Sequence, residues 1–267
     1  MKVRLDVLLV EKGYFESREK AKRAIMAGLV FIGQERYDKA GTMVSEDSDI
    51  HVKGDTCPYV SRGGLKLEKS IKTWELDLKD NVCMDIGSST GGFTDCMLQN
   101  GASKVYALDV GTNQLAYSLR IDPRVVVMEK TNIRDLDTDN FEKLDFISID
   151  VSFISLNLVL PVASALLKEE GRIVSLVKPQ FEAGREKVGK GGIVRDKSVH
   201  REVIQNVIKY AENAGLTPFG LSFSPITGAK GNIEYLLYMK KASESETSLT
   251  DKDISDIVEN SHSELEK

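Results

Sequence analysis

The chain has 267 residues, of which 41% are hydrophobic and 29% charged, so it can form one large domain or two smaller ones with buried cores. No apolar run reaches the roughly eighteen residues that suggest a membrane span, and Glu11 and Lys12 interrupt the apolar patch near the N-terminus, unlike in a signal peptide. The three cysteines, Cys57, Cys83 and Cys96, lack the spacing of metal ligands. We therefore expect a cytoplasmic protein without a metal site.

The net charge of −5 is unevenly distributed along the chain. The serine-rich residues 242–267 include eight acidic residues and two lysines, so the rest of the chain has a net charge of +1. Ile254, Ile257 and Val258 could form one amphipathic turn, but an acidic segment with so few apolar residues is typical of disorder. We expect a solvated tail here, and the total charge does not exclude a nucleic-acid partner for the remainder.

Residues 1–56 predict a small α+β domain. The segment 4–12 has apolar residues at helical spacing and ends at Gly13. A second helix is expected between Ser17, a good N-cap, and Gly28, a good terminator. Residues 29–52 alternate and turn like short strands.

The second of these helices is strongly basic, which by itself is more typical of a solvated polar face than of an RNA contact. However, "RLD" at Arg4–Asp6 and "SREKAKRAIMAGLVFIG" at 17–33 resemble the RNA-binding domain first seen in ribosomal protein S-four. Clustered cations release counterions when they bind phosphates. The resemblance implies RNA contacts by the basic residues Arg4, Arg18, Lys20, Lys22 and Arg23.

Residues 57–64, "CPYVSRGG", have the composition of a linker. From 65 to 241, strand-like and helix-like segments alternate, with strands expected at 81–87, 104–111, 125–133, 144–153, 172–181, 220–228 and 232–241, and helices at 92–101, 156–171 and 197–215. This alternation predicts an α/β domain with a mostly parallel, Rossmann-like sheet covered on both faces.

A glycine-rich loop follows the first of these strands, in "MDIGSSTGGFTD". A glycine cluster alone is as often a structural turn as a ligand site, and this one contains no P-loop lysine. Asp85 would repel a pyrophosphate but suits a cofactor with a cationic end, and Asp109 closes the next strand, where ribose hydroxyls are held in such folds. The pattern favours S-adenosylmethionine and a class I methyltransferase over a dehydrogenase. The candidate cofactor-binding residues are Asp85, Gly87, Ser89, Gly91, Gly92, Phe93, Asp109 and Asn132.

Four ionisable residues lie at predicted strand ends or at the start of the domain: Lys66, Asp150, Lys178 and Glu234. Each alone is more often an ion-pair partner than a catalyst. Methylation of a ribose hydroxyl would benefit from a positioned base, and lysine can serve when its surroundings favour the neutral amine. Pro179 ends the strand directly after Lys178, which leaves that amine at the ligand-bearing edge of the sheet.

These four residues fall where the FtsJ-like ribose 2′-O-methyltransferases have a Lys-Asp-Lys-Glu tetrad. With "YVSRGGLKL", "IDVSFISL", "LVKPQFE" and "GGIVRD", the chain up to about residue 241 resembles the TlyA family. The resemblance implies methylation of a cytidine ribose in ribosomal RNA; we expect 23S RNA as the substrate, and whether 16S RNA is modified as well stays open. It implies that Lys178 acts as general base or orients the nucleophile, that Asp150 and Glu234 hold and tune the lysines, and that Lys66 positions the target ribose.

The segment 182–196 combines four glycines with several cations. It is either an ordinary mobile surface loop or, as we prefer, a basic flap that closes over RNA. Its candidate RNA contacts are Arg185, Lys187 and Lys190, to which we add Arg62 of the expected linker.

Three other functions compete with ribose methylation. A base N-methyltransferase would have two prolines near 150–153, and a cytosine C5-methyltransferase would have a cysteine at a strand end; neither is found. Some relatives are named hemolysins, so a membrane-lytic protein is a second hypothesis, although no strongly amphipathic basic helix supports it. An RNA-binding protein without catalysis is the third.

Overall fold

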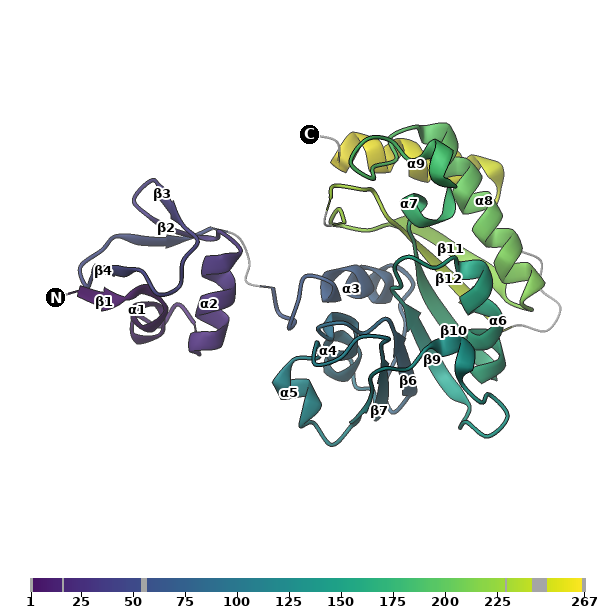
Figure 1. Cartoon of the computed structure of the whole chain (residues 1–267), viewed down its shortest axis with the longest axis horizontal. Helices are drawn as coiled ribbons and strands as arrows, with labels where there is room; N and C mark the ends of the chain where they lie inside the picture. Colours follow the sequence, from purple (N-terminus) through teal and green to yellow (C-terminus); the bar gives the residue numbers. More distant parts are fainter. Residues whose placement is uncertain (1, 16, 54–56, 229, 242–248, 266–267) are drawn as a thin grey trace. The chain divides into compact units, whose positions relative to one another are not determined.

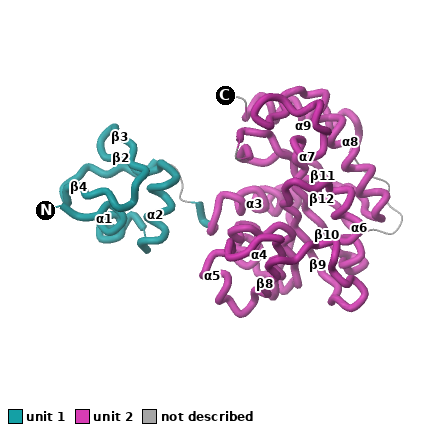
Figure 2. The backbone as a smooth tube through the Cα atoms, viewed as in Figure 1, with its two compact units in different colours: residues 1–58 teal, residues 59–267 magenta. Residues whose placement is uncertain are grey.

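The computed structural model describes residues 2–15, 17–53, 57–228, 230–241 and 249–265. The chain forms two compact units, Met1–Pro58 and Tyr59–Lys267 (Figure 2). Most of the expected linker therefore belongs to the second unit. Tyr59 is only 5% exposed, and the backbone N–H of Val60 donates to Asp95 at 2.7 Å, so this segment packs as part of the larger domain.

The first unit is the expected small α+β domain. Its helices are α1 (Leu5–Glu11) and α2 (Arg18–Met26), and the Ser17 side chain accepts the Lys20 amide at the start of α2, as its N-cap position predicts. A three-stranded antiparallel sheet has the order β3-β2-β5, and a separate pair joins β1 to β4. These strands are β1 (Lys2–Arg4), β2 (Val30–Ile32), β3 (Glu35–Tyr37), β4 (Met43–Ser45) and β5 (Ile50–Val52).

The second unit is built on a seven-stranded sheet of order β11-β12-β10-β9-β6-β7-β8. All neighbouring pairs from β10 to β8 are parallel, whereas β12 is antiparallel to both of its neighbours. The predicted mostly parallel, Rossmann-like sheet is therefore confirmed. The strands are β6 (Val82–Ile86), β7 (Lys104–Leu108), β8 (Val125–Met128), β9 (Leu144–Ile149), β10 (Leu167–Val177), β11 (Thr217–Phe223) and β12 (Tyr235–Lys240).

Helices cover the two faces of this sheet (Figure 1). One pair of helices in contact is α3 (Gly64–Thr73) and α4 (Gly92–Gln99). A second pair is α6 (Leu156–Leu166) and α8 (Lys197–Asn213). The buried residues of α6 and α8 form one continuous hydrophobic core with strand residues such as Ile147, Ile173 and Leu237. Shorter segments complete the unit: α5 (Tyr117–Arg120), η1 (Ile133–Asp135), α7 (Pro179–Glu182) and η2 (Arg185–Lys187).

The expectation of a solvated tail is wrong for residues 251–265, which form helix α9 (Asp251–Leu265). The helix begins with a capping box, in which Thr250 and Asp253 exchange hydrogen bonds between side chain and backbone. Ile254 and Val258 are 3% and 0% exposed and join the core beside α8. The acidic residues occupy the outer face, so the composition concealed an apolar stripe. Residues 242–248 of the expected tail lie outside the described residues.

Candidate functional site

The sheet reverses its strand order between β6 and β9, which lie side by side although the chain visits β7 and β8 between them. Gly87 follows β6, Asp150 follows β9, and Lys178 follows β10. Parallel strands present these three residues at the same edge of the sheet. A topological switch point of this kind is where open α/β sheets bind their ligands.

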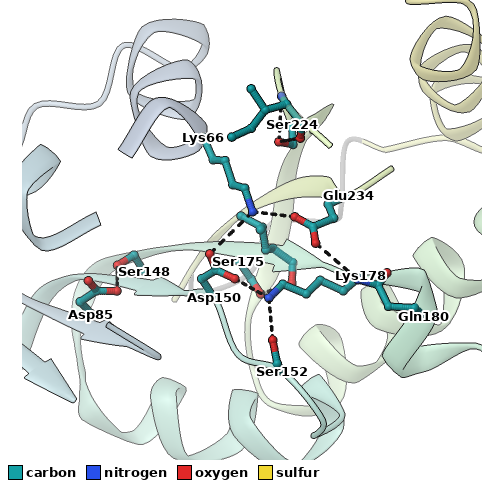
Figure 3. Close-up of polar contacts among 12 residues, drawn as sticks. Lys66, Asp85, Ser148, Asp150, Ser152, Ser175, Lys178, Gln180, Ser224 and Glu234 are labelled. Atoms are coloured by element: carbon teal, nitrogen blue, oxygen red, sulfur yellow. Dashed lines mark hydrogen bonds and ion pairs between the residues drawn. The ribbon is translucent and has the colours of Figure 1, made fainter. Parts of the chain in front are cut away.

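Two lysines and two carboxylates meet at this edge (Figure 3). Lys178 Nζ lies 2.5 Å from Asp150 Oδ1, and Lys66 Nζ lies 2.6 Å from Glu234 Oε2 and 3.8 Å from Asp150 Oδ2. Lys66, Lys178 and Glu234 are each less than a tenth exposed. Four residues from α3 and the ends of three strands thus form one buried network whose formal charges cancel. The sequence predicted the four members and the edge of the sheet, and the structure brings them together.

The network forms part of a cavity of about 530 Å³. Phe153 is 90% exposed and its ring lies 4.8 Å from that of Phe181, at the same cavity. Other lining residues come from the basic loop and from the segment just before β12, including Val188, Gly192 and Asn232. The cavity therefore has a charged floor, an aromatic pair and a wall made by the basic loop.

Sequence reasoning missed two polar residues of this cavity. Ser152 Oγ lies 3.1 Å from Lys178 Nζ, and Gln180 Nε2 donates to Glu234 Oε1 at 3.4 Å. The Oε1 atom of Gln180 is the one buried side-chain oxygen or nitrogen within the described ranges that has no hydrogen-bond partner. Both residues lie two positions from a tetrad member, and that proximity was the available signal.

The glycine loop forms a second, smaller cavity of about 130 Å³, which shares Gly87, Ser89 and Asp150 with the first. Gly87 has φ +88°, and a Cβ added there would overlap the backbone carbonyl oxygen of Asp150. Gly91, at the N-terminus of α4, has φ +93°. Glycine is required at both positions because L-residues with a side chain rarely adopt this backbone conformation. The loop therefore lies closer to β9 than any other residue type would permit.

Asp85 lies beneath this loop and is 1% exposed. Its carboxylate accepts hydrogen bonds from the amide and hydroxyl of Thr94 at 2.9 and 2.7 Å, and from the hydroxyl of Ser148 at 3.2 Å. Burial raises the pKa of Asp85 to about 7, although the Thr94 hydrogen bond opposes the shift; nearby Asp150 adds to the rise. Cations are absent from this set of partners. A ligand with a cationic group would favour the ionised carboxylate, so the pocket fits the phosphate-free, positively charged cofactor that the sequence predicted.

Most of the remaining expected cofactor residues lie in or next to the glycine loop, whereas Asn132 does not. Phe93, Gly92 and Ser89 line the small cavity. The carboxylate of Asp109 accepts the amides of Ser89 and Gly111 at 2.8 and 2.7 Å, so it fastens the glycine loop to the end of β7. Asn132 instead caps η1, where its side chain accepts the Arg134 amide, and it is not among the residues that line either cavity.

Two of the candidate cations of the first unit, Arg4 and Arg18, pair with a carboxylate that the sequence did not single out as a site residue. Asp6 is 0% exposed and lies 2.9 Å from both Arg4 and Arg18. The hydrogen bond from Arg4, together with Arg18, lowers the pKa of Asp6 to about 2 against the opposing effect of burial. Both arginine side chains remain about half exposed, so they can also reach a phosphate. Lys22 pairs with Glu19 at 2.9 Å on the same helix.

Three candidate cations of the second unit belong to the basic loop 182–196: Arg185, Lys187 and Lys190. Lys187 pairs with Glu202 of α8 at 2.6 Å, which ties η2 to that helix. Arg185 lines a groove next to the main cavity, beside Phe153 and Phe181. Arg62 precedes α3, which carries Lys66. None of these contacts involves RNA, so all the candidate RNA contacts remain predictions: Arg4, Arg18, Lys20, Lys22, Arg23, Arg62, Arg185, Lys187 and Lys190.

Comparison with known proteins agrees with this architecture. Residues 59–241 match the FtsJ-like methyltransferase family and residues 3–50 match the S4 domain. A Bacillus subtilis protein, YqxC, whose name carries a provisional assignment as an rRNA methyltransferase, is 54% identical over all of this chain and 96% of its own length. The 16S/23S rRNA (cytidine-2′-O)-methyltransferase TlyA of Mycobacterium tuberculosis is 39% identical over 98% of both chains. A solved structure from Streptococcus thermophilus, provisionally titled a hemolysin, is 49% identical with a TM-score of 0.79 and covers 99% of this chain and 97% of its own.

Proposed function

The chain belongs to the TlyA/hemolysin A family of ribosomal RNA 2′-O-methyltransferases, and we propose that it methylates the 2′-hydroxyl of a cytidine in ribosomal RNA. The observation that carries this proposal is the position of Lys178, which lines the larger cavity and is held there by Ser152 and by Asp150, a residue that lines both cavities. A ribose in the larger cavity could present its 2′-oxygen to this amine. A small cofactor in the glycine-loop cavity would lie on the other side of Asp150.

S-adenosylmethionine supplies a methyl group bound to a sulfonium when it occupies the glycine-loop cavity. Asp85, Gly87, Gly91 and Gly92 would hold it, the glycines by close backbone approach. Asp109 would position the loop through its bonds to the Ser89 and Gly111 amides, and its carboxylate oxygens have lone pairs left for ribose hydroxyls.

The four charged side chains have distinct tasks in this proposal. Lys178 aligns the 2′-oxygen with the methyl donor and takes its proton when the amine is neutral. Asp150 holds Lys178 in place. Glu234 and Lys66 form a second ion pair beside it, and Lys66 also lies 3.8 Å from Asp150, which links the two pairs. Gln180 fixes the orientation of Glu234 through its amide N–H.

The RNA substrate is proposed to contact both units. The S4 domain would bind through Arg4 and Arg18, which Asp6 orients, and the second unit through Arg185, Lys187, Lys190 and Arg62. Of the ribosomal RNAs, we propose 23S RNA as the substrate, because two relatives of 39% and 40% identity are named for it; 16S RNA is tested as a further substrate, because the first of them is named for both. A ribosomal substrate would place the reaction in the cytoplasm.

The test is methylation of isolated ribosomal subunits with radiolabelled S-adenosylmethionine. A 2′-O-methyl group blocks alkaline cleavage at its own linkage, so the modified nucleotide appears as a gap in the hydrolysis ladder. The proposal expects a gap at a cytidine in large-subunit RNA. Small-subunit RNA is assayed in parallel, and a gap there would make 16S RNA a further substrate. Label on a base, with an unbroken ladder, would contradict it.

The hemolysin name borne by relatives suggests a lytic protein instead. Among the residues for which the structure gives a placement, none of the helices combines the length and apolarity needed to cross a bilayer. Liposome leakage that persists in a Lys178→Ala variant would support a lytic function independent of methyl transfer.

A further inference from the structure

Helix α9 contributes two side chains to a second buried polar cluster, whose members do not line the larger cavity. Ser261 and His262 are 0% and 4% exposed. Nε2 of His262 lies 3.1 Å from Nδ1 of His200 in α8, and the hydroxyl of Ser261 lies 3.1 Å from that of Tyr235 in β12. The Tyr235 hydroxyl in turn lies 2.7 Å from the same Nδ1 of His200. Two side chains of α9 thus meet one histidine and one tyrosine of the methyltransferase core.

The hydrogen-bond partners determine how His200 is held. Its Nε2 lies 3.0 Å from the backbone carbonyl of Val194, and a carbonyl can only accept, so this nitrogen donates. In the neutral ring Nδ1 is then an acceptor, and it faces both Tyr235 and His262. The ring is therefore fixed at one nitrogen by the core and α9, and at the other by the basic loop.

Val194 connects this cluster to the cavity. Its amide donates to Asn232 Oδ1 at 3.0 Å, and the Nδ2 of Asn232 donates to the carbonyl of Gly192 at 2.9 Å. Gly192 and Asn232 both line the larger cavity. The wall formed by 192–194 is thus bound at two points, by Asn232 and by His200.

Glu234 lies in the sequence between Asn232, which holds the 192–194 wall, and Tyr235, which contacts His200. Asn232 precedes it by two residues, and Tyr235 follows it directly. The backbone carbonyl of Glu234 accepts the amide of Ser224 at 2.8 Å, which fixes the segment to β11. A displacement of Tyr235 or of 192–194 would therefore shift the Glu234 carboxylate and the wall it faces.

We propose that Ser261 and His262 of α9 are positioning residues for methyl transfer, acting through His200 and Tyr235 on the 192–194 wall and on Glu234. The proposal rests on the proposed function of the cavity. Buried hydrogen-bond networks restrict their members to one arrangement, and transfer rates depend steeply on alignment because displacements of about 1 Å can cost on the order of a hundred-fold. The C-terminal helix is then part of the catalytic architecture as well as of the hydrophobic core.

The test compares His262→Leu, which removes both ring nitrogens, with His262→Gln, whose amide can reach the position of Nε2. Val258→Ala is the matched control, because it weakens the packing of the same helix without removing a polar group of the cluster. Single-turnover methylation of large ribosomal subunits, S-adenosylmethionine affinity by calorimetry, and amide hydrogen exchange of residues 189–195 are measured for each.

His262→Leu is expected to lower the single-turnover rate on the order of ten-fold, to leave cofactor affinity unchanged, and to speed exchange in 189–195 but not in β6. His262→Gln should restore most of the single-turnover rate and most of the slow exchange in 189–195. Val258→Ala should change neither the rate nor this exchange beyond its effect on unfolding. Equal effects of His262→Leu and Val258→Ala would overturn the proposal, as would unchanged exchange in 189–195. If the wild-type protein methylates no ribosomal RNA, the proposed function fails, while the exchange measurement still tests the link from α9 to the loop.

Discussion

Asp150 Oδ1 lies 2.5 Å from Lys178 Nζ, and its other oxygen lies 3.8 Å from Lys66. One carboxylate therefore touches both lysines of the site, and it also lines both cavities. Its backbone carbonyl is the group that excludes any side chain at Gly87. Asp150 is thus the residue through which the charge network and the glycine loop are linked.

Replacement of Lys178 separates its two possible roles. Lys178→Ala should reduce methyl transfer by about two to four orders of magnitude, the usual range for a positioned acid–base group. Lys178→Arg keeps the cation but cannot act as a base at neutral pH, because a guanidinium is not deprotonated in proteins. If Lys178 only orients the hydroxyl, the arginine variant should retain substantial single-turnover activity; if it accepts the proton, both variants should be equally slow. Cofactor affinity should be unchanged in both, and a loss of affinity would place Lys178 in cofactor binding instead.

Gly87→Ala should abolish cofactor binding. The added Cβ would overlap the Asp150 carbonyl and must displace either the loop or the end of β9. Gly215→Ala is the control, because Gly215 also has positive φ, +72°, but its Cβ would meet nothing within 4 Å. Both variants should lose about 1 kcal/mol of stability from the backbone conformation. Only Gly87→Ala should lose S-adenosylmethionine binding in calorimetry, and equal binding by the two would argue against the loop as the cofactor site.

Asp85→Asn should flatten the pH dependence of unfolding. The folded-state pKa of Asp85 is about 7, against 3.8 for the free side chain, so between these pH values the folded protein holds a proton that the unfolded chain releases. The wild-type free energy of unfolding should therefore fall by up to about 1.4 kcal/mol per pH unit from this group as pH rises through that window. Asparagine can keep the Thr94 and Ser148 hydrogen bonds and does not titrate. In urea unfolding at pH 4, 5.5 and 7, the free energy of unfolding of the variant should rise relative to that of the wild type as the pH increases. The same pH dependence of this free energy in both proteins would contradict the raised pKa.

Ile254→Ala tests the docking of α9. Removing a side chain that is 3% exposed should lower the free energy of unfolding by about 2–5 kcal/mol through lost burial and a residual cavity. Asp256→Ala, on the exposed outer face of the same helix, should stay within about 0.5 kcal/mol of the wild type. Thermal or urea unfolding of both variants gives the comparison. Two equal and negligible effects would mean that residues 251–265 are solvated after all.

The fold of the methyltransferase unit could be predicted because its signals are local. Short β-rich runs and amphipathic helices alternate through 65–241, and such alternation leaves a parallel sheet as the only compact way to bury all the apolar faces. The same logic placed Asp150 and Lys178, since residues that end parallel strands meet at one edge. The glycine loop was recognisable because positive φ and close backbone approach demand glycine whatever the surroundings.

The tail could not be predicted in the same way. Its composition is acidic, and an apolar stripe of Ile254 and Val258 is stable only when another surface covers it. That surface is made by α8 and the sheet, which are remote in sequence, so the choice between solvated chain and docked helix depended on tertiary packing. The capping box of Thr250 and Asp253 was a local signal for the helix start, but not for its docking.

The sequence by itself determined the two-domain organisation, the sheet with its glycine loop, and the four charged residues of the site. Periodicity, turn chemistry and strand ends are properties of residues that are neighbours in the sequence, so they can be recognised without the tertiary structure. Only the tertiary structure decided that Asp150 contacts both lysines, that Gln180 donates a hydrogen bond to Glu234, and that His262 meets His200. Contacts within the site join segments up to 168 residues apart, as Lys66 and Glu234 show. Distances between such segments depend on how the whole core packs, and no local pattern encodes them.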